Sequence, residues 1–239
     1  TYKEDKDYWM EQISLIPPAP MLPLQKDPSV IRKPQFARIE KVIPKSEWNV
    51  LQKEAKKKGI TTSTLLCTAY ALVLGYWSNQ PELTINVTVF TRYPFNEGVT
   101  DIVGDFTSVI LLRVNLLGRS DFWKLASEIQ NQLMDALEHR HYDGMNVIRK
   151  IAEQAEMKEQ AVMPVVFTSL LFSMEEGDIV TIEDLGEVKM GVSQTSQVYL
   201  DYQVMETKEG LLITWDYIKE LFTPNMISTM FKQYINIVE

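Results

Sequence analysis

The residues best suited to chemistry lie in one run near the end of the chain, Ser193–Gln203. Taken as a β-strand, this run has two faces, because successive side chains of a strand point to opposite sides. The apolar face, which suits packing against helices, carries Val198, Leu200, Tyr202 and Val204. The polar face carries Gln197, Tyr199, Asp201 and Gln203. Two amides and a phenol can orient the carboxylate of Asp201 and tune its pKa, so Asp201 is a candidate for acid–base chemistry. The alternative interpretation is that these residues form the solvated outer face of an edge hairpin.

The two histidines of the chain form a second candidate. They lie in the run His139–Gly144 (HRHYDG), which contains the pattern His-x-x-x-Asp-Gly. That pattern is the signature of acyltransferases of the chloramphenicol-acetyltransferase type, in which the histidine is the general base. Here His139 ends a predicted helix and Asp143 precedes the next one, and both positions have structural explanations in helix electrostatics and capping. We favour the structural interpretation and keep catalysis by His139 as an alternative.

Composition excludes several classes of function. The 239 residues suit one large domain or two small ones, and 45% apolar with 23% charged residues is ordinary for a globular protein. A net charge of −8 argues against a nucleic-acid surface and gives no electrostatic reason to bind anionic membranes. The single cysteine, Cys67, excludes an internal disulfide and fits a reducing compartment. No segment is long and apolar enough to cross a bilayer, so we expect a cytoplasmic protein.

Hydrophobic periodicity predicts the elements that must position these residues. An opening helical segment and a strap with four prolines occupy residues 1–35. From residue 36 onward the order is a strand, two helices, two strands, two helices, three or four strands and a final helix. The predicted helix caps are Thr61 or Thr62 before the helix Ser63–Ser78, and Ser120, Asp143 and Thr223 before the later helices. We therefore predict an α/β (α+β) two-layer sandwich over residues 36–239. The strand Leu83–Phe90 also has a polar face, formed by Thr84, Asn86 and Thr88.

Five separated segments together resemble one family, the heterocyclization domains of nonribosomal peptide synthetases, which are a branch of the condensation-domain superfamily. The segments are Leu15–Leu24 (LIPPAPMLPL), Thr62–Ser78, Gly104–Leu112 (GDFTSVILL), Pro164–Leu170 (PVVFTSL) and Ser193–Gln203 (SQTSQVYLDYQ). The last segment is particular to the cyclizing branch. Ser196 departs from the family pattern, which usually has proline at that position.

The resemblance covers only the second half of such a domain. The family fold is a V-shaped pair of chloramphenicol-acetyltransferase-like halves with the active tunnel between them. Its signature Asp-x-x-x-x-Asp lies in the N-terminal half, before the proline strap, and is absent here. Since residue 1 is not methionine, we expect the chain to be the C-terminal subdomain of a longer polypeptide, inactive by itself. We also expect the hairpin from Asp201 to Tyr217 to include the element that crosses onto the missing half.

The resemblance further implies an activity and a set of site residues. The intact domain would join a carrier-bound acyl thioester to cysteine, serine or threonine and then cyclodehydrate the product to a thiazoline or oxazoline. Asp201 and Thr168 match the catalytic aspartate and threonine of the family, and Asn86 matches an asparagine of the same site. The expected substrate-binding residues are Gln194, Gln197 and Gln203.

The same resemblance sets expectations for partners and cofactors. The partners would be the missing N-terminal subdomain, peptidyl or aryl carrier domains and an adjacent adenylation domain, with no nucleic acid and no membrane. No cofactor would bind directly, because the 4'-phosphopantetheine arms of the carriers hold the substrates. Two alternatives stay open, a half-domain that docks carriers without catalysis and a stand-alone acyltransferase that uses His139.

Overall fold

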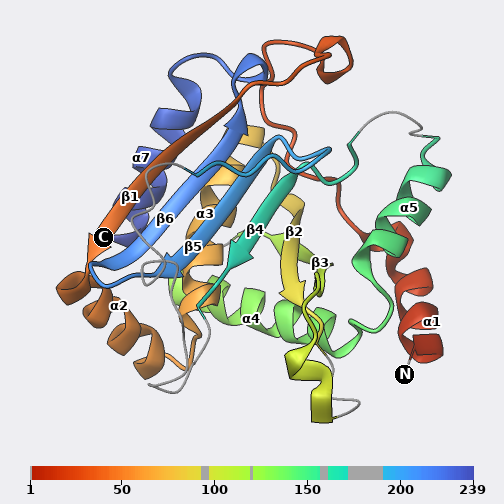
Figure 1. Ribbon diagram of the computed structural model, residues 1–239, viewed down its shortest axis with the longest axis horizontal. Helices are drawn as coiled ribbons and strands as arrows, with labels where there is room; N and C mark the ends of the chain where they lie inside the picture. Colours follow the sequence, from red (N-terminus) through yellow and green to blue (C-terminus); the bar gives the residue numbers. More distant parts are fainter. Residues whose placement is uncertain (1, 93–96, 119–120, 157–160, 172–190) are drawn as a thin grey trace.

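The fold is built around a single mixed β-sheet of six strands in the order β1-β6-β5-β4-β2-β3 (Figure 1). The structure is a computed structural model that describes residues 2–92, 97–118, 121–156, 161–171 and 191–239. The strands are β1 (Phe36–Pro44), β2 (Glu82–Phe90), β3 (Thr107–Asn115), β4 (Val165–Ser169), β5 (Leu200–Glu206) and β6 (Gly210–Ile218). β4 runs parallel to both β2 and β5, and the remaining pairs are antiparallel. The short central β4 therefore joins a hairpin on one side to a hairpin on the other.

Four helices cover one face of the sheet and form most of the core with it. They are α2 (Lys45–Lys57), α3 (Thr62–Ser78), α4 (Phe122–Glu138) and α7 (Met226–Val238). The apolar side of β5 packs here as the alternation predicts, since Leu200, Tyr202 and Val204 are fully buried. Tyr202 also shares a hydroxyl–hydroxyl hydrogen bond of 2.6 Å with Tyr234 of α7. The predicted α/β two-layer architecture is confirmed.

Two further helices stand apart from these four, beside β3 (Figure 1). They are α1 (Tyr2–Gln12) and α5 (Gly144–Gln154). α5 approaches β3 so closely that a Cβ on Gly144 would lie 2.3 Å from the carbonyl oxygen of Val109. The side chain of Val109 contacts the start of α5, which places α5 on the face of the sheet that the other four helices leave uncovered.

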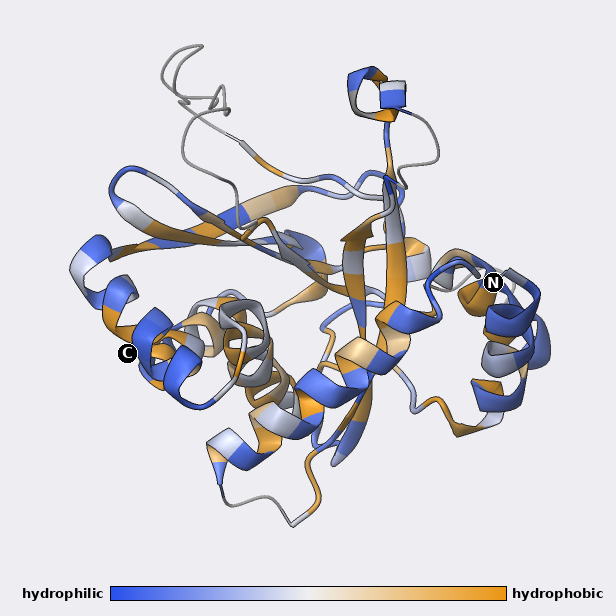
Figure 2. Cartoon of the chain, turned by 90° about the horizontal axis from the view of Figure 1, so that it is seen from below, coloured by the Kyte–Doolittle hydropathy of each residue, from blue (hydrophilic) through white to orange (hydrophobic). Residues whose placement is uncertain are grey.

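Short 3-10 turns complete the secondary structure at the ends of these elements and in the loops. They are η1 (Ile13–Leu15), η2 (Pro28–Val30), η3 (Glu97–Asp101) and η4 (Lys219–Leu221). Figure 2 shows η3 at the tip of an extension that projects well beyond the sheet. The extension follows β2 and precedes β3, so it prolongs that hairpin away from the helices.

The helix boundaries confirm some predicted caps and correct others. Thr61 caps α3 and Asp143 caps α5, each accepting a hydrogen bond from a backbone N–H of the first turn. α4 is capped by Asp121, whose carboxylate accepts from the N–H of Lys124, whereas the predicted cap Ser120 lies outside the described residues. α7 begins at Met226, after Thr223 and Pro224, with Asn225 in the cap position. The predicted strand Pro164–Phe172 is shorter than expected, because β4 ends at Ser169 and Phe172 lies outside the described residues.

The proline strap packs along the molecule, as its composition predicts. Thr84 of β2 donates to the carbonyl of Pro17 at 2.6 Å, and its N–H donates to Pro18 at 3.0 Å. Of the three long apolar side chains Met21, Leu22 and Leu24, only that of Leu22 is buried, whereas Met21 is 67% exposed. Hydrogen bonds to the backbone carbonyls of Pro17 and Pro18 therefore attach the strap to β2.

In the part of the chain that the structure describes, no single helix meets the length and hydropathy needed to cross a membrane. α2 and α3 meet those criteria only as a pair, and they are bent by 97°.

Candidate functional site

The strand register gathers polar side chains into two rows on the face of the sheet opposite α3 and α7. Residues that pair directly across neighbouring strands point to the same face. One row crosses five strands and consists of Arg38, Asp216, Asp201, Val166 and Asn86. The second row lies two residues further along each strand and consists of Glu40, Thr214, Gln203, Thr168 and Thr88. Asp201, Thr168 and Asn86, predicted from three distant segments, therefore share one face.

Asp201 is buried in the middle of this face, with 6% of its surface exposed. Its Oδ2 accepts a hydrogen bond of 2.9 Å from the side-chain amide of Gln203. Its Oδ1 is buried and has no hydrogen-bond partner among the described residues. A buried acceptor without a donor is costly, so this oxygen is available to a group that enters the site.

The surroundings of Asp201 raise its pKa above the ordinary value of an aspartate. Burial is the main cause, because it disfavours the charged carboxylate. Ser193 and Gln203 act in the opposite direction by hydrogen bonding, the nearby charge of Asp216 raises the pKa, and Arg38 lowers it. A carboxyl group with a raised pKa can hold a proton and release it to a substrate.

Asp216 lies directly opposite Asp201 on β6 and is even more deeply buried, at 1% exposed. Arg38 binds it with two parallel hydrogen bonds, Nε to Oδ1 at 2.8 Å and Nη2 to Oδ2 at 2.6 Å. The backbone N–H of Ser193 donates a third bond to Oδ2 at 2.7 Å. This ion pair also ties down the segment that leads into β5.

Thr168 and Asn86 extend the site toward β2. Thr168 and Thr88 share a hydroxyl–hydroxyl hydrogen bond of 2.8 Å between adjacent strands. Thr168 lies diagonally across from Asp201, since Asp201 pairs with Val166. Asn86 is 7% exposed, and its Oδ1 is a second buried acceptor with no partner in the described part of the chain. Val166 therefore lies between two unpartnered oxygens in one row.

Two of the predicted substrate-binding glutamines lie outside the strands that form this site. The predicted strand begins at Leu200, so Gln194 and Gln197 are exposed residues of the preceding segment. Gln197 has a left-handed backbone, with φ of 62°, in a turn before β5. Only Gln203 contacts Asp201. The period-of-two pattern was extended too far toward the N-terminus, and a turn at residues 196–197 breaks it.

Gln197 and Tyr199 instead line a groove of about 940 Å³ beneath the proline strap. Its walls also include strap residues Ile16–Leu22, Ile151 and Ala155 of α5, and Phe222. Burial is the main reason that the pKa of the Tyr199 phenol is raised. Asp201, Thr168 and Asn86 do not line this groove.

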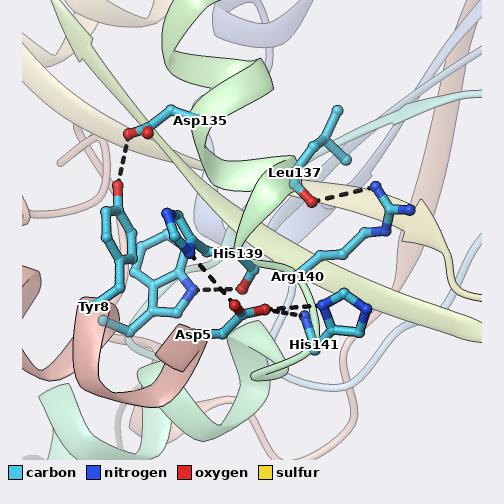
Figure 3. A network of polar contacts seen from close by, with 8 residues as sticks. Asp5, Tyr8, Asp135, Leu137, His139, Arg140 and His141 are labelled. Carbon is cyan, nitrogen blue, oxygen red and sulfur yellow. Dashed lines mark hydrogen bonds and ion pairs between the residues drawn. The ribbon is translucent and has the colours of Figure 1, made fainter. Parts of the chain in front are cut away.

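His139 and Asp143 serve structural roles, in line with the interpretation that we favoured. Figure 3 shows His139 and His141 gathered around Asp5 of α1. The ring of His139 stacks on Tyr8 with 3.7 Å between the ring centres. Asp143 caps α5 and accepts from Ser108 at 2.9 Å. The two members of the His-x-x-x-Asp pattern therefore bind different partners.

Asp216 and Arg38 are the residues of the site that the sequence interpretation missed. The hairpin carried part of the signal, because its turn brings the residues around Asp216 onto the strand that faces Asp201. The exact partner depends on the length of the turn: β5 and β6 pair Glu206 with Leu211, and counting outward from that pair places Asp216 opposite Asp201. No such local count could find Arg38, since β1 lies far away in the sequence. Among the described residues, no three His, Cys, Asp or Glu side chains are grouped as metal ligands would be.

Comparison with known proteins identifies the family. The family profile described as "Condensation domain" matches residues 1–239. This chain belongs to the condensation-domain family. Condensation-type relatives include bacitracin synthase 1 of Bacillus licheniformis, 42% identical over the whole chain, and pyochelin synthetase PchE of Pseudomonas aeruginosa, 31% identical over 98% of the chain. Phenyloxazoline synthase MbtB of Mycobacterium tuberculosis is 33% identical over 97% of it.

Solved structures of condensation-type domains match the fold closely. The cyclization-docking bidomain of EpoB from Sorangium cellulosum superposes with a TM-score of 0.89 at 32% identity over 99% of this chain. The X-domain from teicoplanin biosynthesis, at 14% identity and a TM-score of 0.75, shares the fold. The chain spans 48% of the EpoB bidomain and 4% and 16% of bacitracin synthase 1 and PchE. It is therefore similar to one part of much longer multidomain synthetases.

Proposed function

We propose that this condensation-type chain carries the cyclodehydrating face of a heterocyclization domain. The domain would join a carrier-bound acyl thioester to cysteine, serine or threonine and convert the amide to a thiazoline or oxazoline. The single observation that supports this most is Asp201, a buried carboxyl group with a raised pKa and an unpartnered oxygen. The printed names of two relatives, a phenyloxazoline synthase and a cyclization bidomain, point to the same chemistry.

The proposed chemistry uses Asp201 as a proton carrier. After amide formation, the side-chain sulfur or oxygen attacks the new carbonyl and gives a ring that bears a hydroxyl group. Protonated Asp201 gives its proton to that hydroxyl, which leaves as water. The ring nitrogen loses its proton to the carboxylate as the C=N bond forms, so Asp201 returns to its starting state.

The neighbours of Asp201 hold the intermediate in this proposal. The hydroxyl of Thr168 retains hydrogen-bonding capacity beyond its bond to Thr88, since a hydroxyl has one donor and two acceptor positions. The unpartnered Oδ1 of Asn86 can accept an N–H or O–H of the substrate. Gln203 orients the carboxyl group of Asp201. Gln194 and Gln197 are exposed residues of the segment before β5, and the proposal assigns them no part in substrate binding.

The substrates would arrive on carrier domains, whose 4'-phosphopantetheine arms hold them as thioesters, and the preceding half of the domain would complete the site. The match to multidomain synthetases supports these partners, and the adenylation domain is expected as a neighbour that loads a carrier.

The test uses the full natural polypeptide with both carriers loaded, and products are released and weighed by mass spectrometry. Asp201→Asn keeps the size of the side chain and removes its acid, so the linear amide should persist while ring formation falls by about 10²- to 10⁴-fold. Asp105→Asn is the matched control, because Asp105 is an exposed carboxylate that only caps a turn at Thr107. Ring product at the normal rate from Asp201→Asn would refute the proposal.

Two other outcomes identify the alternatives. A polypeptide that binds loaded carriers but makes neither amide nor ring would be a docking module. Acyl transfer by the 239-residue chain alone, abolished by His139→Ala, would identify a stand-alone acyltransferase.

A further inference from the structure

We propose that the Arg38–Asp216 ion pair is a positioning unit that holds a second carboxylate directly opposite Asp201 and thereby assigns the exchangeable proton to Asp201. The inference rests on the proposed function of Asp201 and adds two residues, from β1 and β6, that act through it. It also explains why one carboxyl group of a facing pair acts as the acid and the other does not.

The geometry makes the two carboxyl groups unequal. Asp216 receives three donors, two from Arg38 and one from the backbone of Ser193, and these stabilise its charged form. Asp201 has only uncharged hydrogen-bonding neighbours, the amide of Gln203 and the hydroxyl of Ser193, and its Oδ1 has no partner among the described residues. Two like charges directly opposite on paired strands repel each other, so the less stabilised group takes up the proton.

The other groups around Asp201 leave this assignment intact. On the helix side, Tyr70 of α3 is fully buried and its pKa is raised well above 10, so it stays neutral. On β1, Glu40 is exposed and acts on Arg38, whose pKa it helps to raise after Asp216. In the segment before β5, Ser193 contributes a neutral hydroxyl. Among the described residues, Asp216 and Arg38 are therefore the charged groups that act on the pKa of Asp201, in addition to the larger effects of burial and of the hydrogen bonds from Ser193 and Gln203.

The pair also holds its own position firmly. The segment 191–193 passes over it, with Gly191 close enough that a Cβ there would lie 3.2 Å from Nη1 of Arg38. The side chain of Asp216 has no exposed surface, and that of Arg38 retains 23%. A buried pair joined by two parallel hydrogen bonds is held in one geometry.

The expected signature is a pair of opposite shifts in the pH dependence of ring formation. Ring formation needs protonated Asp201, so its rate falls as pH rises through the pKa of that group. Asp216→Asn removes the negative charge and leaves Arg38 facing Asp201, which moves the falling limb to lower pH. Arg38→Gln removes the cation and moves the limb to higher pH. On the alkaline limb, Asp216→Asn should slow ring formation by about three- to tenfold at a fixed pH.

The experiment measures amide and ring formation separately, in single turnovers of the full natural polypeptide with loaded carriers. Glu47→Gln removes an exposed carboxylate from α2, on the other face of the sheet, and should reproduce the wild-type profile. Arg38→Lys keeps the charge but loses the bidentate geometry, and should shift the limb less than Arg38→Gln. The inference would be overturned in favour of a structural role by any of three results for Asp216→Asn and Arg38→Gln. The limbs could be unchanged in both variants, they could shift in the same direction, or the rate of ring formation could fall equally at every pH.

A spectroscopic titration separates this inference from the proposed function. The infrared C=O band of a protonated carboxyl group, taken as the difference from Asp201→Asn, follows the proton on Asp201 without any turnover. The band should disappear at lower pH in Asp216→Asn and at higher pH in Arg38→Gln. Because this readout needs no substrate, it tests the ion pair even if Asp201→Asn still forms the ring.

Discussion

At the scale of single residues, the candidate site contains hydroxyl groups that hydrogen-bond to one another across neighbouring strands. These bonds fix the positions of the side chains. Thr168 and Thr88 are joined at 2.8 Å on the polar face of the sheet. Ser169, the next residue of β4, shares an equally short bond of 2.7 Å with Ser63 at the start of α3. One strand thus presents two similar hydroxyl pairs on opposite sides, and only one of them faces Asp201.

This arrangement provides a matched test of Thr168. Thr168→Val keeps the shape of the side chain and removes its hydroxyl, so we expect ring formation to fall about tenfold, the value of one hydrogen bond of about 1.4 kcal/mol. Ser169→Ala should leave ring formation close to wild type, because its hydroxyl points to the helix face. Single-turnover mass spectrometry of both variants gives the comparison, and equal effects would argue against a special role for Thr168.

The residue scale also shows what the sequence could and could not predict. Alternation correctly placed Asp201 and Gln203 on the polar side and Tyr202 and Val204 in the core. It failed at Gln197, because periodicity carries no information about where a strand begins. Arg38 was out of reach for a different reason, since its pairing with Asp216 depends on two strands 178 residues apart.

At the scale of elements, a buried carboxylate, Asp5, is central to the contacts that attach α1 to the rest of the molecule. Asp5 accepts from the backbone N–H of His141 at 2.9 Å, and its carboxylate contacts the rings of His141 at 3.0 Å and His139 at 3.4 Å (Figure 3). Trp9 and Tyr8 add hydrogen bonds to the carbonyl of His139 and to Asp135. The histidines that resemble a catalytic motif therefore form the docking site of a helix.

We predict that Asp5→Ala detaches α1 without unfolding the sheet. The loss of hydrogen bonds to a charged group should lower the free energy of local opening of α1 by about 1–3 kcal/mol. Amide hydrogen exchange over residues 2–12 should become correspondingly faster. Asp7→Ala, an exposed aspartate on the same helix, is the control and should exchange as wild type. If exchange over α1 is the same in both variants, Asp5 does not hold the helix.

The pH dependence of this attachment follows from the pKa of Asp5. Burial raises that pKa, but the hydrogen bonds from His141 and His139 lower it more, so the net value lies below the ordinary 3.8. A depressed carboxyl pKa stabilises the folded state above the unfolded value and loses this contribution as pH falls through the folded value. Protection of α1 should therefore persist above pH 4 and disappear below it, and hydrogen exchange across this range measures it.

The element scale was the most predictable from sequence. The order of strands and helices follows from periodicity, and the caps at Thr61 and Asp143 follow from side chains that compete for free N–H groups. The cap of α4 was placed one residue too early, because Ser120 and Asp121 are both good capping residues. The expected crossing of the hairpin onto another half is wrong for these strands, since β5 and β6 both lie inside this sheet.

At the scale of the whole molecule, the projecting β2–β3 tip exposes apolar side chains. Val103 is fully exposed and Ile102 is 52% exposed, beside η3. Arg92 stabilises the tip by donating to the carbonyls of Val99 and Ile102 and by packing over the ring of Phe106 at 4.0 Å. An ordered projection with an apolar end is typical of a contact surface.

If the proposed preceding half of the domain is present in the natural polypeptide, we expect this tip to be buried against it. Val103→Asp would then place a charge in an apolar contact and lower the stability of the domain by about 2 kcal/mol. Val30→Asp in the strap, where the valine is 66% exposed, is the control and should have little effect. Thermal unfolding of the complete polypeptide decides the matter, and equal midpoints for the two variants would contradict the expected contact.

Gly210 lies at the start of β6, six residues and about 20 Å along the strand from Asp216. Its backbone, with φ of 149°, approaches β1 so closely that a Cβ would lie 2.0 Å from the carbonyl oxygen of Ile43. Any larger residue there must push apart the strands that bring Arg38 to Asp216. Replacing one hydrogen atom of Gly210 by a side chain would thus move the Arg38–Asp216 pair and change the electrostatic environment of Asp201. Variation at this turn is consequently a route by which proton transfer can be altered while every side chain of the site is kept.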